Sequence, residues 1–221
     1  MARIARITVP RYPHYVTQRG NYQKPVFETE DDYEHYIQWL HEYAGEYSLK
    51  IWAYCLMPDH VHLVCVPAEK DSLSRALNLL HMRYSQYFNR KRNEKGHLWQ
   101  GRFYSCILDK KHTYAAVRHI ENNPVRAGIV RKPHRYKWSS AYSHVTQKRD
   151  GILSYDCYLN AEIEDWSEYL REKDYEQIIK NIKKCSMTGR PCGDDRFIKK
   201  FEKLLGRRIK TLPPGRPLKN K

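Results

Sequence analysis

The sequence predicts an α+β fold, in which helices pack on a small, largely antiparallel sheet of the ferredoxin-like type of sandwich. Short extended segments alternate with amphipathic helical segments through about residue 122, and this order is typical of the class. Hydrophobic residues make up 41% of the 221 positions and aromatic residues 13%, enough for a packed core. No internal repeat is evident.

The first two predicted elements are a strand and a helix. Residues 7–21, ITVPRYPHYVTQRGN, alternate apolar and polar side chains around two prolines and end at Gly20-Asn21, which indicates a strand followed by a turn. Thr29 and Asp32 then resemble a capping box with Asp in place of Glu. The helix continues with apolar residues at helical spacing: Tyr33, Tyr36, Ile37, Leu40, Tyr43, Ala44 and Tyr47.

Residues 49–66 return to extended character, with Pro58-Asp59 as an interruption. Asp71 or Ser72 is the expected start of a second helix. The apolar stripe of that helix is Leu73, Leu77, Leu80, Tyr84 and Phe88.

Another strand is expected over residues 103–108, and a third helix over residues 111–122. That helix should stop near Pro124, because a residue before proline disfavours the helical region.

The character of the chain changes after about residue 145, so we expect a domain over 1–145 and a basic helical extension over 146–221. Residues 164–184 are helical in pattern and highly charged. A short helix within 193–208 is expected to turn four side chains inward: Phe197, Phe201, Leu204 and Leu205. The last 26 residues carry ten Lys and Arg against one Glu, and the single Gly-Arg-Pro around Arg216 resembles the centre of an AT-hook.

The formal net charge of +15 predicts a nucleic-acid partner, with an anionic membrane surface as the lesser option. The N-terminus lacks a signal-like apolar segment and no apolar run approaches the roughly 18 residues of a spanning helix, so we expect a cytoplasmic, nucleoid-associated protein without a membrane partner. Six cysteines without a CxxC pair favour reduced thiols over a disulfide framework: Cys55, Cys65, Cys106, Cys157, Cys185 and Cys192.

One motif stands out in the extended segment LMPDHVHLVCV, residues 56–66. His60 and His62 are two apart, so on a strand they share one face, while Val61 and Leu63 take the other. The pair is either the exposed polar face of an edge strand or two metal ligands held side by side.

Five segments in order resemble the HUH single-tyrosine transposases, and most closely the REP-associated tyrosine transposases: YVTQRGN, WAYCLMPDHVHLV, HLWQGRFYSCILD, NNPVRAGIV and WSSAYSH. The resemblance covers about residues 1–145. It implies a ferredoxin-like sheet with His-hydrophobic-His on a central strand, and a metal-dependent endonuclease and strand transferase acting on single-stranded or hairpin DNA. A site of two imidazoles and an amide that leaves room for phosphate oxygens favours Mg²⁺ or Mn²⁺.

The resemblance breaks at one position. In the family a tyrosine attacks the DNA phosphate, and a polar ligand to the metal follows one helical turn later. Here the corresponding segment is RHIENNPV, so Asn123 matches the ligand and His119 stands at the nucleophile position.

Three interpretations of this departure stay open. His119 itself attacks phosphorus, which a neutral imidazole can do without losing a proton. Alternatively Tyr114 or Tyr104 substitutes, although Tyr114 is nine residues before Asn123 and so nearly on the opposite helix face. Otherwise covalent chemistry is lost, with His119 as a third metal ligand or a space-filling residue, and the protein is a DNA-binding relic or a water-using nuclease.

Basic and aromatic side chains around these segments are candidates for DNA contact. Trp99, Phe103 and Tyr104 interleave with arginine, which suits base stacking, although Trp99 and Phe103 fit the core equally well. The rival functions are a non-catalytic DNA-binding protein and, more distantly, an RNA-binding module. The sequence leaves the oligomeric state open between monomer and homodimer. The candidate phosphate-binding arginines are Arg11, Arg19, Arg102, Arg118, Arg126 and Arg216.

Overall fold

The computed structural model describes residues 7–209, and its centre is a four-stranded antiparallel sheet. The strands lie in the order β2-β3-β1-β4. The predicted α+β class is therefore confirmed. The strand bounds are β1 His14–Arg19, β2 Leu49–Met57, β3 His60–Pro67 and β4 Tyr104–Ile107.

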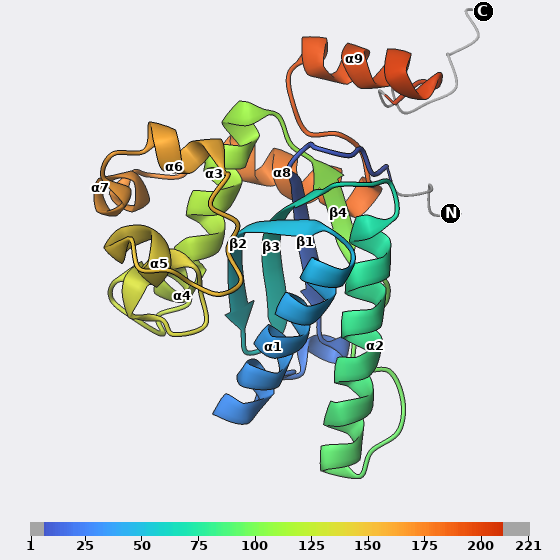
Figure 1. The fold of residues 1–221 in the computed structure, drawn as a ribbon, viewed down its shortest axis with the longest axis vertical. Helices are drawn as coiled ribbons and strands as arrows, with labels where there is room; N and C mark the ends of the chain where they lie inside the picture. Colours follow the sequence, from blue (N-terminus) through green and yellow to red (C-terminus); the bar gives the residue numbers. More distant parts are fainter. Residues whose placement is uncertain (1–6, 210–221) are drawn as a thin grey trace, which may run out of the picture.

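Helices cover both faces of the sheet (Figure 1). On one face α1 (Glu30–Glu46) and α2 (Ser72–Arg92) pack against each other and the strands; on the other, α3 (Lys110–Glu121) and α8 (Glu176–Thr188) do so. Helix α1 connects β1 to β2, which flank β3, and α2 connects β3 to β4, which flank β1. This split arrangement places β3 and β1 at the centre of the sheet.

The remaining helices are short. Two of them are 3₁₀ turns, η1 before α1 and η2 before α5. The bounds of all the remaining helices are η1 Asn21–Gln23, α4 Asn123–Arg126, η2 Pro133–Arg135, α5 Ala141–Thr146, α6 Tyr158–Glu162, α7 Trp166–Arg171 and α9 Asp195–Leu205.

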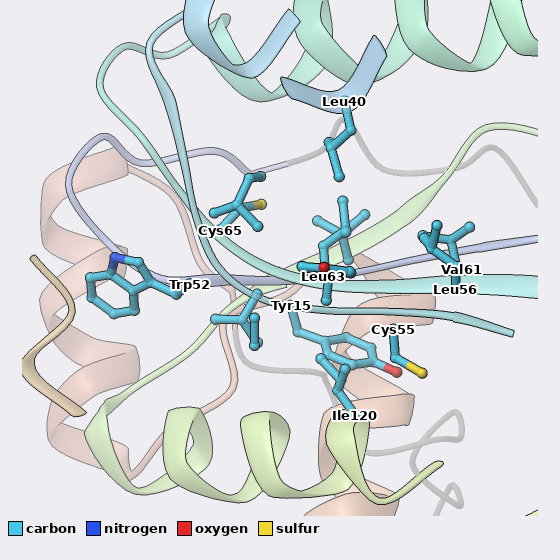
Figure 2. Close-up of a cluster of buried hydrophobic side chains, with 14 of the residues drawn as sticks. Tyr15, Leu40, Trp52, Cys55, Leu56, Val61, Leu63, Cys65 and Ile120 are labelled. Atoms are coloured by element: carbon cyan, nitrogen blue, oxygen red, sulfur yellow. The ribbon is translucent and has the colours of Figure 1, made fainter. Parts of the chain in front are cut away.

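The hydrophobic core lies on both sides of the strands. Figure 2 shows Leu40 of α1 facing Leu63 on one side, and Tyr15 next to Ile120 of α3 on the other. A fully buried leucine stabilises the fold by about 1.5–3 kcal/mol relative to an exposed one, so Leu63 and its neighbours hold β3 firmly in place. The histidine-bearing strand is thus a rigid central element.

The C-terminal part of the described chain is fastened to this sheet. The backbone N–H of Ser154 donates to the carbonyl of Ile51 at 2.8 Å, and that of Cys192 donates to the carbonyl of Ile107 at 2.7 Å. The division of the chain at residue 145 stays a prediction.

Several expectations are refined by the structure. Trp99 and Phe103 are buried, so the core interpretation of these two rings holds rather than base stacking. Leu204 is 61% exposed rather than inward, whereas Phe201 of the same helix is fully buried. The charged stretch 164–184 is two helices, α7 and α8, with a break between them.

No disulfide links the six cysteines, all of which lie within residues 7–209. In the same part of the chain, none of the helices combines the length and apolar character needed to cross a membrane.

Candidate active site

Strand β3 places two imidazoles next to each other at its start. The ring centroids of His60 and His62 are 4.7 Å apart. Because side chains alternate along a strand, both rings lie on the face covered by α3 and α8, while Val61 and Leu63 point into the core beneath α1 and α2. His62 is 7% exposed and His60 is half-buried, so the two rings are largely covered by the protein and do not lie on an open edge of the sheet.

Asn123 meets this pair from the helical side. Its Nδ2 lies 3.1 Å from Nε2 of His60. Asn122 between α3 and α4 keeps helical dihedral angles (φ −83°, ψ −1°), so the chain passes from one helix to the next without a sharp break. His119 and Asn123 are therefore one turn apart; Asn123 contacts His60, and His119 is near enough for its charge to lower the pKa of His62.

Each imidazole has its Nδ1 hydrogen-bonded to a neighbour. The Nδ1 of His60 lies 2.5 Å from Oδ1 of Asp59, and the Nδ1 of His62 lies 2.9 Å from the hydroxyl of Tyr15. A carboxylate accepts, so His60 carries its proton on Nδ1 and its Nε2 presents a lone pair. The bond to Tyr15 uses Nδ1 of His62 and leaves its Nε2 on the other side of the ring.

This donor set fits a divalent cation. Metal-binding histidines commonly donate their second N–H to a carboxylate or another oxygen; His60 donates in this way to Asp59, and the Tyr15 hydroxyl is the oxygen partner of His62. A half-turn of the Asn123 amide exchanges Nδ2 for Oδ1 beside His60, which would supply an oxygen ligand. Within the described part of the chain no three His, Cys, Asp or Glu side chains form a metal-binding group, and the Asn123 amide stays the candidate third ligand.

The alternative in which His119 joins the other two histidines as a ligand stays a prediction.

The electrostatics of the site favour neutral rings next to positive charge. Burial lowers the pKa of His62 well below its usual value, with the charges of His60 and His119 acting in the same direction. Burial also lowers the pKa of His60, against the opposing effect of Asp59. Arg19 lies opposite His60 in the β1–β3 register, so its cation stands over the same face. Neutral ligands surrounded by arginine suit an anionic phosphate.

His119 is held by a carboxylate from a distant part of the chain. Its Nδ1 lies 3.2 Å from Oδ2 of Asp174, which also pairs with Arg118 and Arg126. Burial lowers the pKa of His119 and Asp174 opposes this. A neutral His119 that donates from Nδ1 keeps a lone pair on Nε2.

The two tyrosine alternatives lie elsewhere. The Tyr114 hydroxyl bonds to Glu162, and the ring packs between Tyr158 and Tyr169, away from the imidazole pair. Tyr104 is on the same sheet face as His62 but on β4, with Thr17 of β1 between them. Neither tyrosine adjoins Asn123.

The candidate phosphate-binding arginines are dispersed. Arg19 and Arg126 border the site: an Nη2 of Arg126 donates to the carbonyl of His119 at 2.5 Å and to Oδ1 of Asn123 at 3.3 Å. Arg118 is buried in ion pairs with Glu172 and Asp174. Arg216 lies outside the described residues.

Two further arginines sit away from the site. The backbone N–H of Arg11 donates to the carbonyl of Pro67, at the far end of β3 from His60. Arg102 lines a cavity of about 390 Å³ with His81 and Trp99, towards α2.

Four residues of the site were not singled out from the sequence. Asp59 adjoins His60, and its place in a Pro-Asp turn was a usable signal. Tyr15 reaches His62 only through strand pairing, and Asp174 reaches His119 from 55 residues away. Lys183 of α8 is near enough to His60 and His119 for its charge to lower the pKa of both.

Comparisons with known proteins agree with this architecture. A solved structure described as "Structure of the REP associates tyrosine transposase bound to a REP hairpin" superposes with a TM-score of 0.55 at 19% identity, over 71% of this chain and 93% of that one, and so shares the fold. A Haemophilus influenzae protein named "Putative REP-associated tyrosine transposase" is 26% identical over 110 residues, which are 45% of this chain. The match spans 62% of the length of that relative. The family model "Transposase IS200 like" matches residues 11–123, just over half of the chain. The chain therefore belongs to the IS200-like transposase family.

Proposed function

We propose that this protein cleaves and rejoins single-stranded or hairpin DNA with the help of a divalent cation held by His60, His62 and Asn123. The observation that carries the proposal is the convergence of Asn123 on His60, 3.1 Å apart and one helical turn from His119. Bound Mg²⁺ or Mn²⁺ would polarise the scissile phosphate and stabilise its developing charge.

The side chains around the ligands have complementary roles. Asp59 and Tyr15 fix the rings of His60 and His62 through their Nδ1 atoms. Arg19 and Arg126 place cations on the same side, where they would orient a bridging phosphate of the DNA backbone.

His119 is the proposed nucleophile. Its neutral Nε2 attacks phosphorus and forms an N–P bond, while the bond from phosphorus to O3′ breaks and the departing oxygen takes a proton from water. The imidazole keeps its Nδ1–H and becomes a cation joined to the 5′ phosphate. The reverse attack by a 3′ hydroxyl reseals DNA, because the linkage retains the energy of the original bond.

The proposed DNA substrate rests on the net charge of the chain and on its similarity to a solved structure. The formal net charge of +15 suits a polyanion. The structure that shares this fold is described as bound to a REP hairpin, and we extend a hairpin substrate to this chain on that ground. With such a substrate we expect a nucleoid-associated protein in the cytoplasm; the monomer and the homodimer stay open as its working form.

The test is a labelled hairpin DNA incubated with the full chain and Mn²⁺, then run on a denaturing gel. We expect a covalent protein–DNA band that mild acid destroys, because an N–P bond is acid-labile whereas a tyrosine O–P bond survives. His119→Ala should abolish the band, and Tyr114→Phe and Tyr104→Phe should keep it.

Other outcomes decide against the proposal in distinct ways. An acid-stable band would assign the attack to a tyrosine. Cleavage without a band would indicate water as the nucleophile, and tight binding without cleavage would support a non-catalytic DNA-binding protein. Cleavage of a matched RNA hairpin at an equal rate would overturn DNA as the substrate.

A further inference from the structure

The carboxylate of Asp174 is surrounded by one imidazole and two guanidinium groups. Its Oδ2 lies 3.2 Å from Nδ1 of His119 and 3.5 Å from an Nη1 of Arg126, and its Oδ1 lies 3.3 Å from Nε of Arg118. The Asp174 side chain is 19% exposed and that of His119 is 11% exposed. The contacts are therefore largely screened from water. Electrostatic interactions are stronger in such a place than in water.

Asp174 comes from a segment that the family model does not match. It lies in the short break between α7 and α8, beyond residue 123. Bonds from Asp174 to Arg118 and His119 place this break beside the end of α3, and α8 then packs against α3 and β4. The side chain of Asn122 also fastens α3 to this region by donating to the carbonyl of Leu170 at 2.8 Å.

We propose that Asp174 is a positioning residue for His119. By accepting the Nδ1–H, it holds the imidazole in the tautomer whose Nε2 is unprotonated. The same carboxylate then offsets the positive charge that the ring acquires when Nε2 bonds to phosphorus. This second role rests on the function proposed above, whereas the tautomer does not.

An ion pair that merely supports the fold is the competing explanation. Arg118 has other partners, since it bonds to Glu172 and donates to the carbonyl of Tyr169 at 3.3 Å. Glu172 lies in the same break and pairs with the same arginine, Arg118, but it forms no hydrogen bond with His119. Glu172→Gln is therefore a matched control for Asp174→Asn.

Arg126 contacts Asp174 through Nη1 and the proposed ligand set through Nη2, so the carboxylate can be changed while the bond to Asn123 stays. Arg126 bonds to Asp174, to the carbonyl of His119 and to Oδ1 of Asn123. Asn123 in turn reaches His60. One arginine thus connects the carboxylate, the proposed nucleophile and the proposed metal ligand.

The first experiment reads the tautomer of His119 in the free full-length protein by ¹⁵N–¹H correlation of the imidazole nitrogens. We expect the Nδ1–H form in the wild type and in Glu172→Gln. In Asp174→Asn an amide N–H can donate to Nδ1, so we expect the population to move to the Nε2–H form. An unchanged spectrum in Asp174→Asn would overturn the inference.

The second experiment measures the rate of covalent adduct formation with hairpin DNA, alongside Mn²⁺ affinity by calorimetry. Asp174→Asn should slow the adduct by at least about 100-fold, as loss of an orienting carboxylate does in other histidine-dependent enzymes. Mn²⁺ affinity and the thermal unfolding midpoint should match those of Glu172→Gln.

The two proposals fail in different ways. If the wild type forms no adduct, the proposed nucleophile is wrong, yet the tautomer still decides the role of Asp174. If the adduct forms and Asp174→Asn slows it no more than Glu172→Gln does, the carboxylate is structural.

Discussion

The two imidazoles of β3 depend on partners that orient their rings. Asp59 bonds to His60 from the turn before the strand, and Tyr15 bonds to His62 from the neighbouring strand β1. Burial raises the pKa of the Tyr15 phenol, so this hydroxyl stays protonated throughout the physiological range. Both partners bond to Nδ1, the nitrogen that would face away from a cation, and so orient Nε2 towards it.

Removal of either partner should weaken metal binding without removing a ligand. We expect Tyr15→Phe and Asp59→Asn to lower Mn²⁺ affinity by roughly 10–100-fold, measured by calorimetry on the free protein. Tyr36→Phe is the control, because that buried hydroxyl bonds to His81 beneath the opposite sheet face, at 3.0 Å. Equal losses in Tyr36→Phe and Tyr15→Phe would indicate general loosening of the fold instead.

Glycine is needed at position 20 because a side chain there would collide with its neighbours, not because of its backbone angle. A Cβ there would lie 2.4 Å from the carbonyl oxygen of Lys24 and 2.7 Å from Cγ1 of Val26, while its own N–H donates to the carbonyl of Asp59 at 2.8 Å. We expect Gly20→Ala to destabilise the protein by about 1–3 kcal/mol in urea unfolding, because the turn that carries Asp59 must shift.

A control for this substitution lies in α1. A Cβ at Gly45 would meet nothing within 4 Å outside its own helix, so Gly45→Ala should stabilise the protein by about 0.5–1 kcal/mol. If Gly20→Ala proves neutral, the close approach at this turn does not constrain the site.

Sequence reasoning proposed a ligand set but not its partners. The shared face of His60 and His62 follows from strand alternation, whereas Asn123 was proposed because its segment resembles the transposase pattern. Tyr15 and Asp174 could not be found, because their contacts depend on strand order and on the packing of α8, which no local pattern encodes.

Among the helices, α1 shows how a local signal becomes a buried electrostatic contact. The predicted capping box is confirmed: the N–H of Thr29 donates to Oδ2 of Asp32 at 2.9 Å. Burial raises the pKa of Asp32, but hydrogen bonds from Lys91, two backbone amides and Tyr87 outweigh it, and the pKa lies below its usual value. Asp32 thereby links α1 to α2.

This lowered pKa predicts the pH dependence of one helix start. Because the folded state binds the Asp32 proton more weakly than the unfolded state, its stabilisation is complete above about pH 5 and is lost as the pH falls below about 4. Asp32→Asn should therefore destabilise the protein by about 1–2 kcal/mol at neutral pH, and the difference should shrink in acid. Urea unfolding over a pH series measures this.

The exposed Asp31 in the same turn supplies the control for that series. Asp31→Asn changes the same charge without removing the capping box or the Lys91 ion pair. A pH-independent difference between Asp32→Asn and Asp31→Asn would contradict a role for the ionised carboxylate.

The helices that sequence periodicity located best are those with a long apolar stripe. The second helix begins at Ser72 after an Asp71 cap, and the third spans Lys110–Glu121, one residue from its predicted start and end. The stretch 164–184 was predicted as one helical segment, since its charges mask the break at which Glu172 and Asp174 bond to Arg118.

At the scale of the whole molecule, positive charge gathers in a cleft of about 690 Å³ beside the edge strand β2. Tyr142, which is 44% exposed, lines it together with five basic side chains: His134, Arg135, Lys137, Lys148 and Arg149. Lys137 pairs with Glu30 and Glu34, whereas Arg135, Lys148 and Arg149 form no ion pair within residues 7–209. Unpaired cations around an exposed aromatic ring suit a nucleic-acid strand.

If a DNA substrate extends from the active site into this cleft, its affinity should depend on these three cations. We expect the variant with Arg135, Lys148 and Arg149 all changed to Ala to bind hairpin DNA more weakly. The slope of log affinity against log salt should fall by about 0.7–0.9 per lost phosphate contact, because fewer counterions are released. Fluorescence anisotropy over a salt series gives the slope.

The control removes three exposed cations in and next to α2 that do not line the cleft, at Lys70, Arg90 and Lys95. Both variants lose the same net charge, so a general electrostatic attraction would flatten both slopes equally. A larger loss in the cleft variant would show that phosphates contact β2 and α5, and the adduct rate at saturating DNA should then stay unchanged. Because the cleft side chains contact neither His60 nor His119, a lower saturated rate would mean that this surface shapes the site rather than binding the strand.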